Sequence, residues 1–165
     1  MVVFSDSIPD LRMRKSEGDF FYRAAALIIQ DGKLLAVKNE DHPGLYYTVG
    51  GAVCINETTQ EAVVREAYEE IGVMLEIDKL AFVNERFIVT NDTKCHEIVF
   101  YHIMKGKSRE SLNIADGRPT DQGAAETLHW LPLDSLNDYN LVPGFLRSWN
   151  LDNITTVEHI ISKEY

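Results

Sequence analysis

Residues 58–72, TTQEAVVREAYEEIG, have the periodicity of a helix with one apolar side. Thr58 and Thr59, followed by Glu61, are typical of a helix start, where a hydroxyl accepts hydrogen bonds from free backbone amides. At 100° per residue the apolar positions form one stripe, which consists of Val63, Val64, Ala67 and Ile71. Gly72 follows, where a helix C-terminus often needs a positive φ. The segment therefore predicts an amphipathic helix whose apolar stripe faces a core.

Short apolar runs before and after this helix predict strands. They are FFYRAAALII (20–29), KLLAVKN (33–39), TVGGAV (48–53), LAFVNERFIV (80–89), HEIVFYHIM (96–104) and ETLHWLP (126–132). Asp31-Gly32, between the first two runs, is a hairpin signal. Residues 142–150, VPGFLRSWN, predict a terminal helix with Pro143 near its first turn. Because strands and helices mix without strict βαβ alternation, the predicted class is α+β or an α/β sandwich.

The length of 165 residues fits one domain. Residues 1–19 are polar and mixed in charge, and they predict a loosely ordered N-terminal arm. The polar stretch 105–125 contains three glycines and a proline, so we expect a long loop there. The sequence carries no repeat or interdomain linker. We therefore expect the arm (1–19) to be followed by a single domain over residues 20–165.

The charge balance disfavours several classes of partner. The chain has 26 acidic and 16 basic residues, a formal net charge of −10, so we expect no nucleic acid polymer as partner. The first residues lack a secretory leader's apolar core, and no run of about 18 apolar residues predicts a membrane span. Two cysteines are too few for a disulfide framework. We expect a soluble protein of the cytoplasm.

Three glutamates lie close together on the predicted helix. Glu66, Glu69 and Glu70 occupy positions i, i+3 and i+4, so their carboxylates converge on one edge and repel one another. A divalent cation would relieve this repulsion, and Mg²⁺ and Mn²⁺ prefer such hard oxygen ligands. No cysteine–histidine cluster has the spacing of a zinc site. For the segment REAYEE alone, the alternative is a solvated acidic helix face.

The wider spacing around these glutamates is more specific. Gly51, Glu57, Arg65-Glu66, Glu69-Glu70 and Gly72 fix seven positions over residues 51–73, a pattern that chance produces on the order of once in ten thousand sequences or less. This stretch resembles the signature of the Nudix hydrolases, G-x5-E-x7-R-E-U-x-E-E-x-G-U, in which U is a bulky aliphatic residue. Ala67 departs from the first U, which affects packing more than chemistry. The hairpin upstream and HWLPLDSL downstream resemble the family more loosely.

The resemblance implies a fold, a reaction and a set of roles. The fold is an α/β/α sandwich with a mixed central β-sheet, and the reaction is hydrolysis of a nucleoside diphosphate linked to another moiety, with Mg²⁺ or Mn²⁺ as cofactor. By position, Glu66, Glu69 and Glu70 would bind metal with a backbone carbonyl of Gly50 or Gly51. Arg65 would orient these carboxylates through an ion pair that includes Glu57.

Three residues are candidates for the general base, and the sequence does not decide among them. Glu66 is the candidate within the signature, and Glu97 is the second because the family often places a functional glutamate on a later strand or loop. Glu85 is a third candidate. Each is also compatible with an ordinary surface carboxylate.

Other side chains are candidates for binding substrate. Arg23, Lys38 and Arg86 lie on predicted strands and could contact phosphates, although solvated or ion-paired positions would also explain them. Aromatic candidates for stacking on a base are Tyr46, Tyr47 and Phe87, with core packing as the alternative. We expect His96 and His102 to be ordinary core or surface histidines. Cys54 has no visible base partner, so we expect no nucleophilic role for it.

The substrate is not specified beyond its class. Nucleotide sugars and (d)NTPs lead, with other organic pyrophosphates close behind. Subgroups of the family carry a proline or a tyrosine after the signature; here no proline precedes Pro119 and no tyrosine precedes Tyr101, which lowers several options without selecting one. One alternative function is a nucleotide-sensing domain of the same fold without catalysis. Another is a structural module with a solvated acidic helix. A homodimer is possible.

Overall fold

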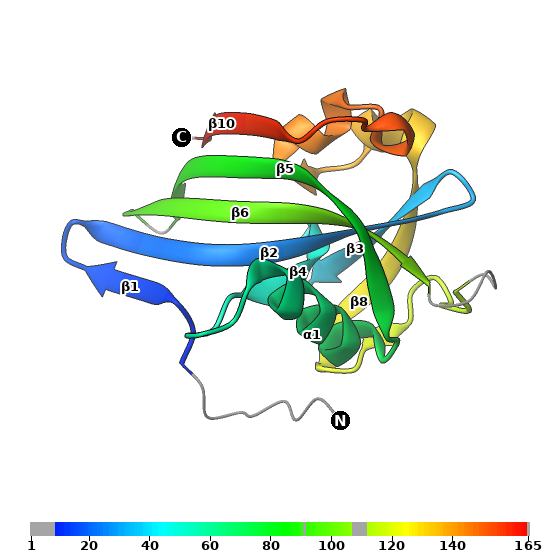
Figure 1. Ribbon diagram of the computed structural model, residues 1–165, viewed down its shortest axis with the longest axis horizontal. Coiled ribbons are helices and arrows are strands. Elements are labelled where there is room, and N and C mark those ends of the chain that lie inside the picture. The colour runs from blue at the N-terminus through cyan, green and yellow to red at the C-terminus, as the bar shows by residue number, and fades with distance from the viewer. Residues whose placement is uncertain (1–8, 91, 107–111, 165) are drawn as a thin grey trace.

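A ten-stranded mixed sheet and one α-helix form the framework of the molecule in a computed structural model, which describes residues 9–90, 92–106 and 112–164 (Figure 1). The strands are β1 Arg12–Lys15, β2 Gly18–Gln30, β3 Lys33–Asn39, β4 Tyr46–Ala52, β5 Leu75–Thr90, β6 Thr93–Gly106, β7 Pro119–Thr120, β8 Gly123–Pro132, β9 Leu141–Val142 and β10 Glu158–Glu164. The helix α1 spans Thr59–Ile71, and three 3₁₀-helices follow: η1 Leu133–Asp138, η2 Gly144–Ser148 and η3 Leu151–Asn153.

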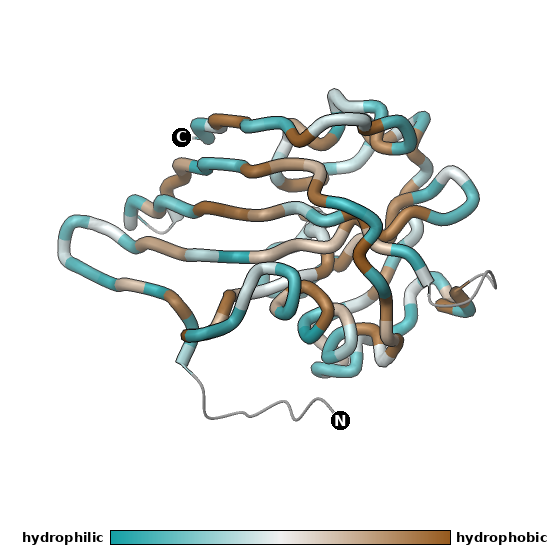
Figure 2. Tube along the Cα trace, in the orientation of Figure 1, coloured by the Kyte–Doolittle hydropathy of each residue, from teal (hydrophilic) through white to brown (hydrophobic). Residues whose placement is uncertain are grey.

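The strand order in the sheet is β10-β5-β6-β2-β4-β3-β8-β7, with β1 paired to β2 and β9 to β4. The β2–β6, β10–β5 and β4–β9 pairs are parallel, and the remaining pairs are antiparallel. This confirms the expected mixed sheet. In Figure 2 the apolar residues concentrate on the central strands, whereas the turn between β1 and β2 is mostly hydrophilic. Across the described ranges, no helix has both the length and the apolar character of a membrane span.

Alternate residues of β2 belong to two separate cores, one on each face of the sheet. Ala24, Ala26 and Ile28 pack in the core under α1. Ala25 and Leu27 pack in the core covered by η1, η2 and η3. Because neighbouring side chains of a strand point to opposite faces, the continuous apolar run of β2 follows from burial on both sides. The predicted sandwich is confirmed, with 3₁₀-helices forming its second helical layer.

The ends of α1 confirm the expected caps. The backbone amide of Glu61 donates to the hydroxyl of Thr58, and the amide of Thr58 donates to the Glu61 carboxylate, which together make a capping box. Gly72 ends the helix with φ of 71°, a left-handed conformation that glycine adopts without a steric penalty. Val63, Ala67 and Ile71 of the apolar stripe are fully buried, which fixes the face that α1 turns to the sheet.

The structure departs from the sequence-based elements at three places. Residues 12–15 of the expected arm form β1, which pairs with β2, while residues 1–8 lie outside the described part. The stretch 105–125, of which 107–111 also lie outside it, includes β7 and the start of β8. The helix predicted at 142–150 is present only as the shorter 3₁₀-helix η2, which buries Leu146; the backbone is extended again at Trp149, and the helix is not terminal. The chain then forms β10, which was not predicted.

Candidate active site

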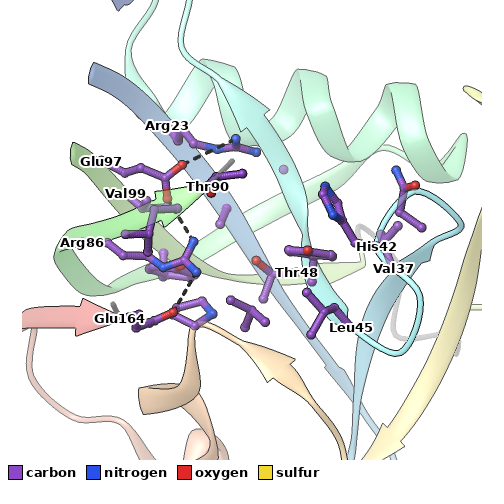
Figure 3. Close-up of a pocket in the computed structure, with 18 of the residues that line it drawn as sticks. Arg23, Val37, His42, Leu45, Thr48, Arg86, Thr90, Glu97, Val99 and Glu164 are labelled. Atoms are coloured by element: carbon purple, nitrogen blue, oxygen red, sulfur yellow. Dashed lines mark hydrogen bonds and ion pairs between the residues drawn. The ribbon is translucent and has the colours of Figure 1, made fainter. Parts of the chain in front are cut away.

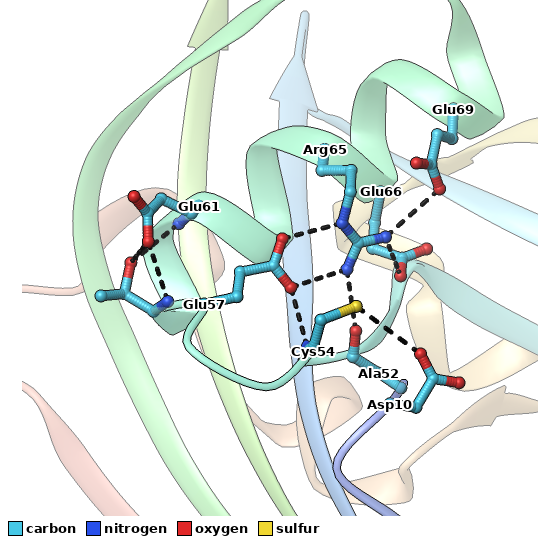
Figure 4. Close-up of polar contacts among 9 residues, drawn as sticks. Asp10, Ala52, Cys54, Glu57, Glu61, Arg65, Glu66 and Glu69 are labelled. Carbon is cyan, nitrogen blue, oxygen red and sulfur yellow. Dashed lines mark hydrogen bonds and ion pairs between the residues drawn. The ribbon is translucent and has the colours of Figure 1, made fainter. Parts of the chain in front are cut away.

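Arg65 joins three parts of the molecule at the edge of α1 (Figure 4). Its Nε and Nη2 donate to the two carboxylate oxygens of Glu57 at 2.8 and 2.9 Å. Nη1 donates to Glu66 at 2.7 Å and to Glu69 at 3.3 Å, and Nη2 also reaches the carbonyl oxygen of Ala52 at 2.9 Å. These bonds, first of all those to Glu57, raise the pKa of Arg65 above its ordinary value. The guanidinium is therefore a fixed clamp between the preceding loop, α1 and β4.

Glu57 is held from both sides. Besides Arg65, the backbone amide of Cys54 donates to it at 2.8 Å. Burial acts to raise the pKa of Glu57, but the hydrogen bonds from Arg65 and Cys54 outweigh burial and lower it. The carboxylate stays ionised and Arg65 keeps its orientation. The ion pair of Arg65 with Glu57 that the resemblance implied is thus present in the structure.

Glu66 lies directly against Gly51 of β4. A Cβ atom added at Gly51 would lie 2.4 Å from the Glu66 carboxylate, closer than real Cβ atoms approach other atoms. Only glycine at this position lets the carboxylate close onto the strand. Burial raises the pKa of Glu66, although Arg65 acts in the opposite direction.

Glu70, one turn further along α1, is buried, and only one of its two carboxylate oxygens has a hydrogen-bond partner among the described residues. Its Oε1 accepts a hydrogen bond from the Gly50 amide at 3.1 Å, and its Oε2 is buried without a partner among the described residues. Burial raises the pKa of Glu70 to about 8. An unpaired buried carboxylate oxygen is costly, and a bound cation would remove that cost.

The donor set therefore fits a hard divalent cation. Glu66, Glu69 and Glu70 offer carboxylate oxygens beside the backbone of β4, which is the chemistry that Mg²⁺ and Mn²⁺ select. Within the part of the chain that the structure describes, no three acidic, histidine or cysteine side chains are arranged to hold a metal ion as they stand, so the fit rests on the chemistry of these oxygens. Arg65 holds both Glu66 and Glu69 through one guanidinium nitrogen, while the Gly50 amide holds Glu70, so all three carboxylates are anchored.

A cavity of about 770 Å³ opens beside Glu70 (Figure 3). Its charged lining residues come from six elements: Arg23, Glu70, Arg86, Glu97, Glu126 and Glu164. Figure 3 shows Arg23, Arg86, Glu97 and Glu164 gathered on one side and His42 on the other. Tyr47 also lines the cavity, and burial raises its pKa. The cavity therefore has one strongly charged end and one end with an imidazole and aromatic surface.

Three of the predicted site residues meet at the charged end. Glu97 is buried, and its carboxylate lies 3.1 Å from Nη1 of Arg86 and 3.9 Å from Nη1 of Arg23. Arg86 also donates to Glu164 of β10 at 2.8 Å. The sheet thus brings Arg23 of β2, Arg86 of β5 and Glu97 of β6 into one cluster.

Several other candidates do not line the cavity. The ammonium of Lys38 lies 5.9 Å from the ring centre of Tyr46, whose own ring contacts His129 and Tyr139. Glu85 bonds His159 at 2.8 Å. The Phe87 ring stacks on His96 at 4.3 Å, and the buried His102 shares a hydrogen bond with Thr59. The Cys54 thiol contacts Asp10, and burial raises its pKa.

Three residues that line the cavity were not among the candidates predicted from the sequence. Glu164 was missed because β10 was not predicted, although its alternation of half-buried and exposed residues marks a strand with one inward face. Glu126 is placed by the β3–β8 register, which sets it opposite Asn39; Asn39 donates to it at 2.8 Å. His42 lies in a loop. Only the prediction of strand pairing would have found the first two.

A family model and a curated relative match this sequence. The sequence model of the NUDIX domain matches residues 20–149. A MutT-like protein of Streptomyces ambofaciens is 37% identical over 60 residues, which are 36% of this chain and 38% of that protein. The match therefore spans well under half of the curated relative's length.

Solved structures share the fold at low sequence identity. A mutator MutT protein from Bacillus halodurans superposes with a TM-score of 0.57 at 16% identity, over 84% of this chain and 89% of that one. A MutT protein from Methanosarcina mazei superposes with a TM-score of 0.55 at 20% identity, over 82% of this chain and 92% of that one. For an ADP-ribose pyrophosphatase from Streptococcus suis the TM-score is 0.50 at 18% identity, and the superposition covers 84% of this chain and 98% of that one. With the domain match over most of its length and the signature intact around Arg65, this chain belongs to the Nudix family.

Proposed function

We propose that this chain is a metal-dependent hydrolase that cleaves the diphosphate linkage between a nucleoside phosphate and another group. The observation that carries the proposal is Glu70: a buried carboxylate, half satisfied by the Gly50 amide, at the wall of a cavity that also contains Arg23. A cation-binding carboxylate beside an arginine suits a phosphate-bearing substrate. In a protein of net charge −10, such a substrate needs cations to approach.

Glu66, Glu69 and Glu70 would hold Mg²⁺ or Mn²⁺ together with a backbone carbonyl of Gly50 or Gly51. When bound, such an ion neutralises phosphate charge and lowers the pKa of a bound water. Arg65 acts as a positioning residue, because its donors are used on Glu57, Glu66, Glu69 and Ala52.

Glu97 is our candidate for the group that accepts the proton of the attacking water. It lines the cavity, whereas Glu66 is turned against Gly51 and Arg65 and does not line it. Arg23, 41% exposed at its side chain, is the cation best placed to meet a phosphate. Attack of water on one phosphorus then breaks the bridging P–O bond and releases a nucleoside monophosphate and a phosphorylated remainder.

The substrate class includes nucleotide sugars, ADP-ribose-like compounds and (d)NTPs. The imidazole and aromatic end of the cavity, with His42 and Tyr47, offers surfaces on which a base could stack. The free thiols of Cys54 and Cys95 suit a reducing compartment, and we propose the cytoplasm.

The test is a panel of such diphosphate compounds, assayed with Mg²⁺, with Mn²⁺ and with a chelator. We expect turnover that requires the metal, and a kcat lowered about 10²–10⁴-fold in Glu66→Gln and Glu70→Gln. The matched control is Glu76→Gln, an exposed acid of β5 outside the cavity, which should keep full activity.

Two results would contradict the proposal. One is turnover in Glu70→Gln equal to wild type at saturating Mg²⁺. The other is binding of these compounds, seen by calorimetry, without hydrolysis of any of them. That second result would instead support a nucleotide-sensing domain.

A further inference from the structure

The strand β10 lies beyond the residues that match the family's domain, yet it contributes to the cavity. It runs parallel to β5 with Glu164 paired to Ile88, and its half-buried residues alternate from Glu158 to Glu164. Fully buried Asn84 donates to the carbonyl oxygen of Ile160 at 3.1 Å and to the hydroxyl of Ser162 at 3.0 Å. These bonds fix the register of β10 and with it the position of Glu164.

Arg86 lies between two carboxylates at the charged end of the cavity (Figure 3). Its Nη1 lies 3.1 Å from Glu97 and its Nη2 lies 2.8 Å from Glu164. The side chains of Arg86 and Glu97 are 13% and 9% exposed, whereas that of Glu164 is 32% exposed. Glu164 is therefore the more accessible carboxylate of this trio, facing whatever approaches Arg86 from the cavity.

The positive charges at this end of the cavity are already offset by carboxylates, so they do not favour binding of an anion. Arg23 and Arg86 supply two positive charges, and Arg86 is already paired with both Glu97 and Glu164. A phosphate that approaches Arg86 also meets the carboxylate of Glu164. Like charges at such a site oppose binding, and they do so more strongly where water is partly excluded. Each additional phosphate at this end is thus disfavoured.

We propose that Glu164 is a specificity-determining residue that limits how much anionic charge the cavity accepts beside Arg86. The proposal rests on the function proposed above and narrows it. Among the candidate substrates, the chain prefers a nucleoside diphosphate joined to an uncharged group, such as a sugar, over a nucleoside triphosphate. Glu164 acts by screening Arg86 and adds no chemical step.

The first test compares Glu164→Gln with wild type on a nucleotide sugar and on the triphosphate of the same nucleoside. Glutamine keeps the size of the side chain and one oxygen that can accept from Arg86, and it removes the negative charge. We expect the ratio of kcat/KM for triphosphate over nucleotide sugar to rise about ten-fold, through a lower KM for the triphosphate. A loss of structure in β10 would instead lower kcat for both substrates.

The matched control is Glu158→Gln on the same side of the same strand. Glu158 lies six residues, about 20 Å, from Glu164, and it bonds Thr156. This variant should leave the ratio at the wild-type value. In Arg86→Met the further change Glu164→Gln should alter the ratio less than two-fold, because the screened charge is already absent.

A binding measurement without metal separates this inference from the proposed hydrolysis. Calorimetry with inorganic pyrophosphate and inorganic triphosphate should show that Glu164→Gln binds triphosphate about ten-fold more tightly than wild type. Unchanged binding of triphosphate and an unchanged substrate ratio would overturn the role of Glu164 even if the enzyme is active. Tighter binding with no turnover of any compound would support Glu164 and overturn only the proposed function.

Discussion

Two arginines in this molecule are each surrounded by carboxylates, but the clusters are assembled differently. Arg65 binds Glu57, Glu66 and Glu69, all within eight residues along the chain. Arg86 binds Glu97, 11 residues away, and Glu164, 78 residues away. Both arginine side chains are 13% exposed. Similar burial and similar partners therefore arise once from a single helix with its preceding loop and once from three strands.

The difference has a physical origin. Helix periodicity brings Arg65 and Glu69 onto the same side of α1, and Glu57 lies in the loop just before the helix, so the first cluster needs only local structure. The second depends on two strand registers, one that pairs Arg86 with Glu97 and one that places β10 along β5. A register slip by one residue would turn these side chains to the opposite face.

Removing each arginine in turn tests whether the local cluster carries more of the stability. We expect Arg65→Met to lower the free energy of unfolding by about 3 kcal/mol, because Glu66, Glu69 and the Ala52 carbonyl lose this donor, while Glu57 keeps only its other donor, a backbone amide. Arg86→Met should cost about 1–2 kcal/mol, since Glu97 keeps Arg23 and Glu164 is partly hydrated. Urea denaturation with a chelator present measures both. An equal or larger loss in Arg86→Met would reverse the comparison.

The same contrast explains what the sequence could predict. The caps at Thr58 and Gly72, the apolar stripe and the spacing of the glutamates are local signals, and the structure bears out the helix they predict. The central strands were equally visible as apolar runs. β10 was not, and η2 was predicted only as a longer helix, because short elements at an edge or over a sheet face lack a periodicity of their own and are defined by what they pack against. Glu164 was not predicted as a site residue because β10, which carries it, was not predicted.

Gly51→Ala tests how tightly the first cluster is closed against β4. The added Cβ would meet the Glu66 carboxylate at 2.4 Å, so Glu66 must move away from the strand. In the proposed hydrolysis we expect kcat to fall about 10–100-fold, which is about 1.4–2.7 kcal/mol, with the fold retained. Steady-state kinetics at saturating Mg²⁺ gives the value.

Gly144→Ala is the control, because its Cβ would meet only the end of the flexible Arg147 side chain at 2.9 Å. It should remain close to wild type. Full activity in Gly51→Ala would mean that the contact between Glu66 and Gly51 has no part in positioning the site.

The stability of the metal-free protein should depend on pH through Glu70. The pKa of Glu70 is about 8 in the folded chain against an ordinary value of 4.5. Between these values the folded state binds more protons than the unfolded state, so the free energy of unfolding falls as pH rises. From pH 5.5 to 8 we expect the titration of Glu70 to lower the free energy of unfolding by about 1–3 kcal/mol.

Glu70→Gln cannot titrate at this position, so it should be more stable than wild type at pH 8 and similar near pH 4.5. Thermal melts over this pH range in the presence of a chelator provide the comparison. If the melting temperatures of the two proteins changed with pH in parallel, the buried Glu70 carboxylate would not lower the stability of the protein.

Binding of Mn²⁺ tests the central claim most directly, because it needs no knowledge of the substrate. Titration followed by electron paramagnetic resonance, with melting temperatures at each concentration, compares wild type with Glu70→Gln. We predict saturable binding to wild type, a melting temperature that rises with Mn²⁺ as mass action requires, and at least ten-fold weaker binding in Glu70→Gln. Equal affinity in the two proteins, or no binding to wild type, would contradict a cation site formed by the carboxylates of α1 against Gly50 and Gly51.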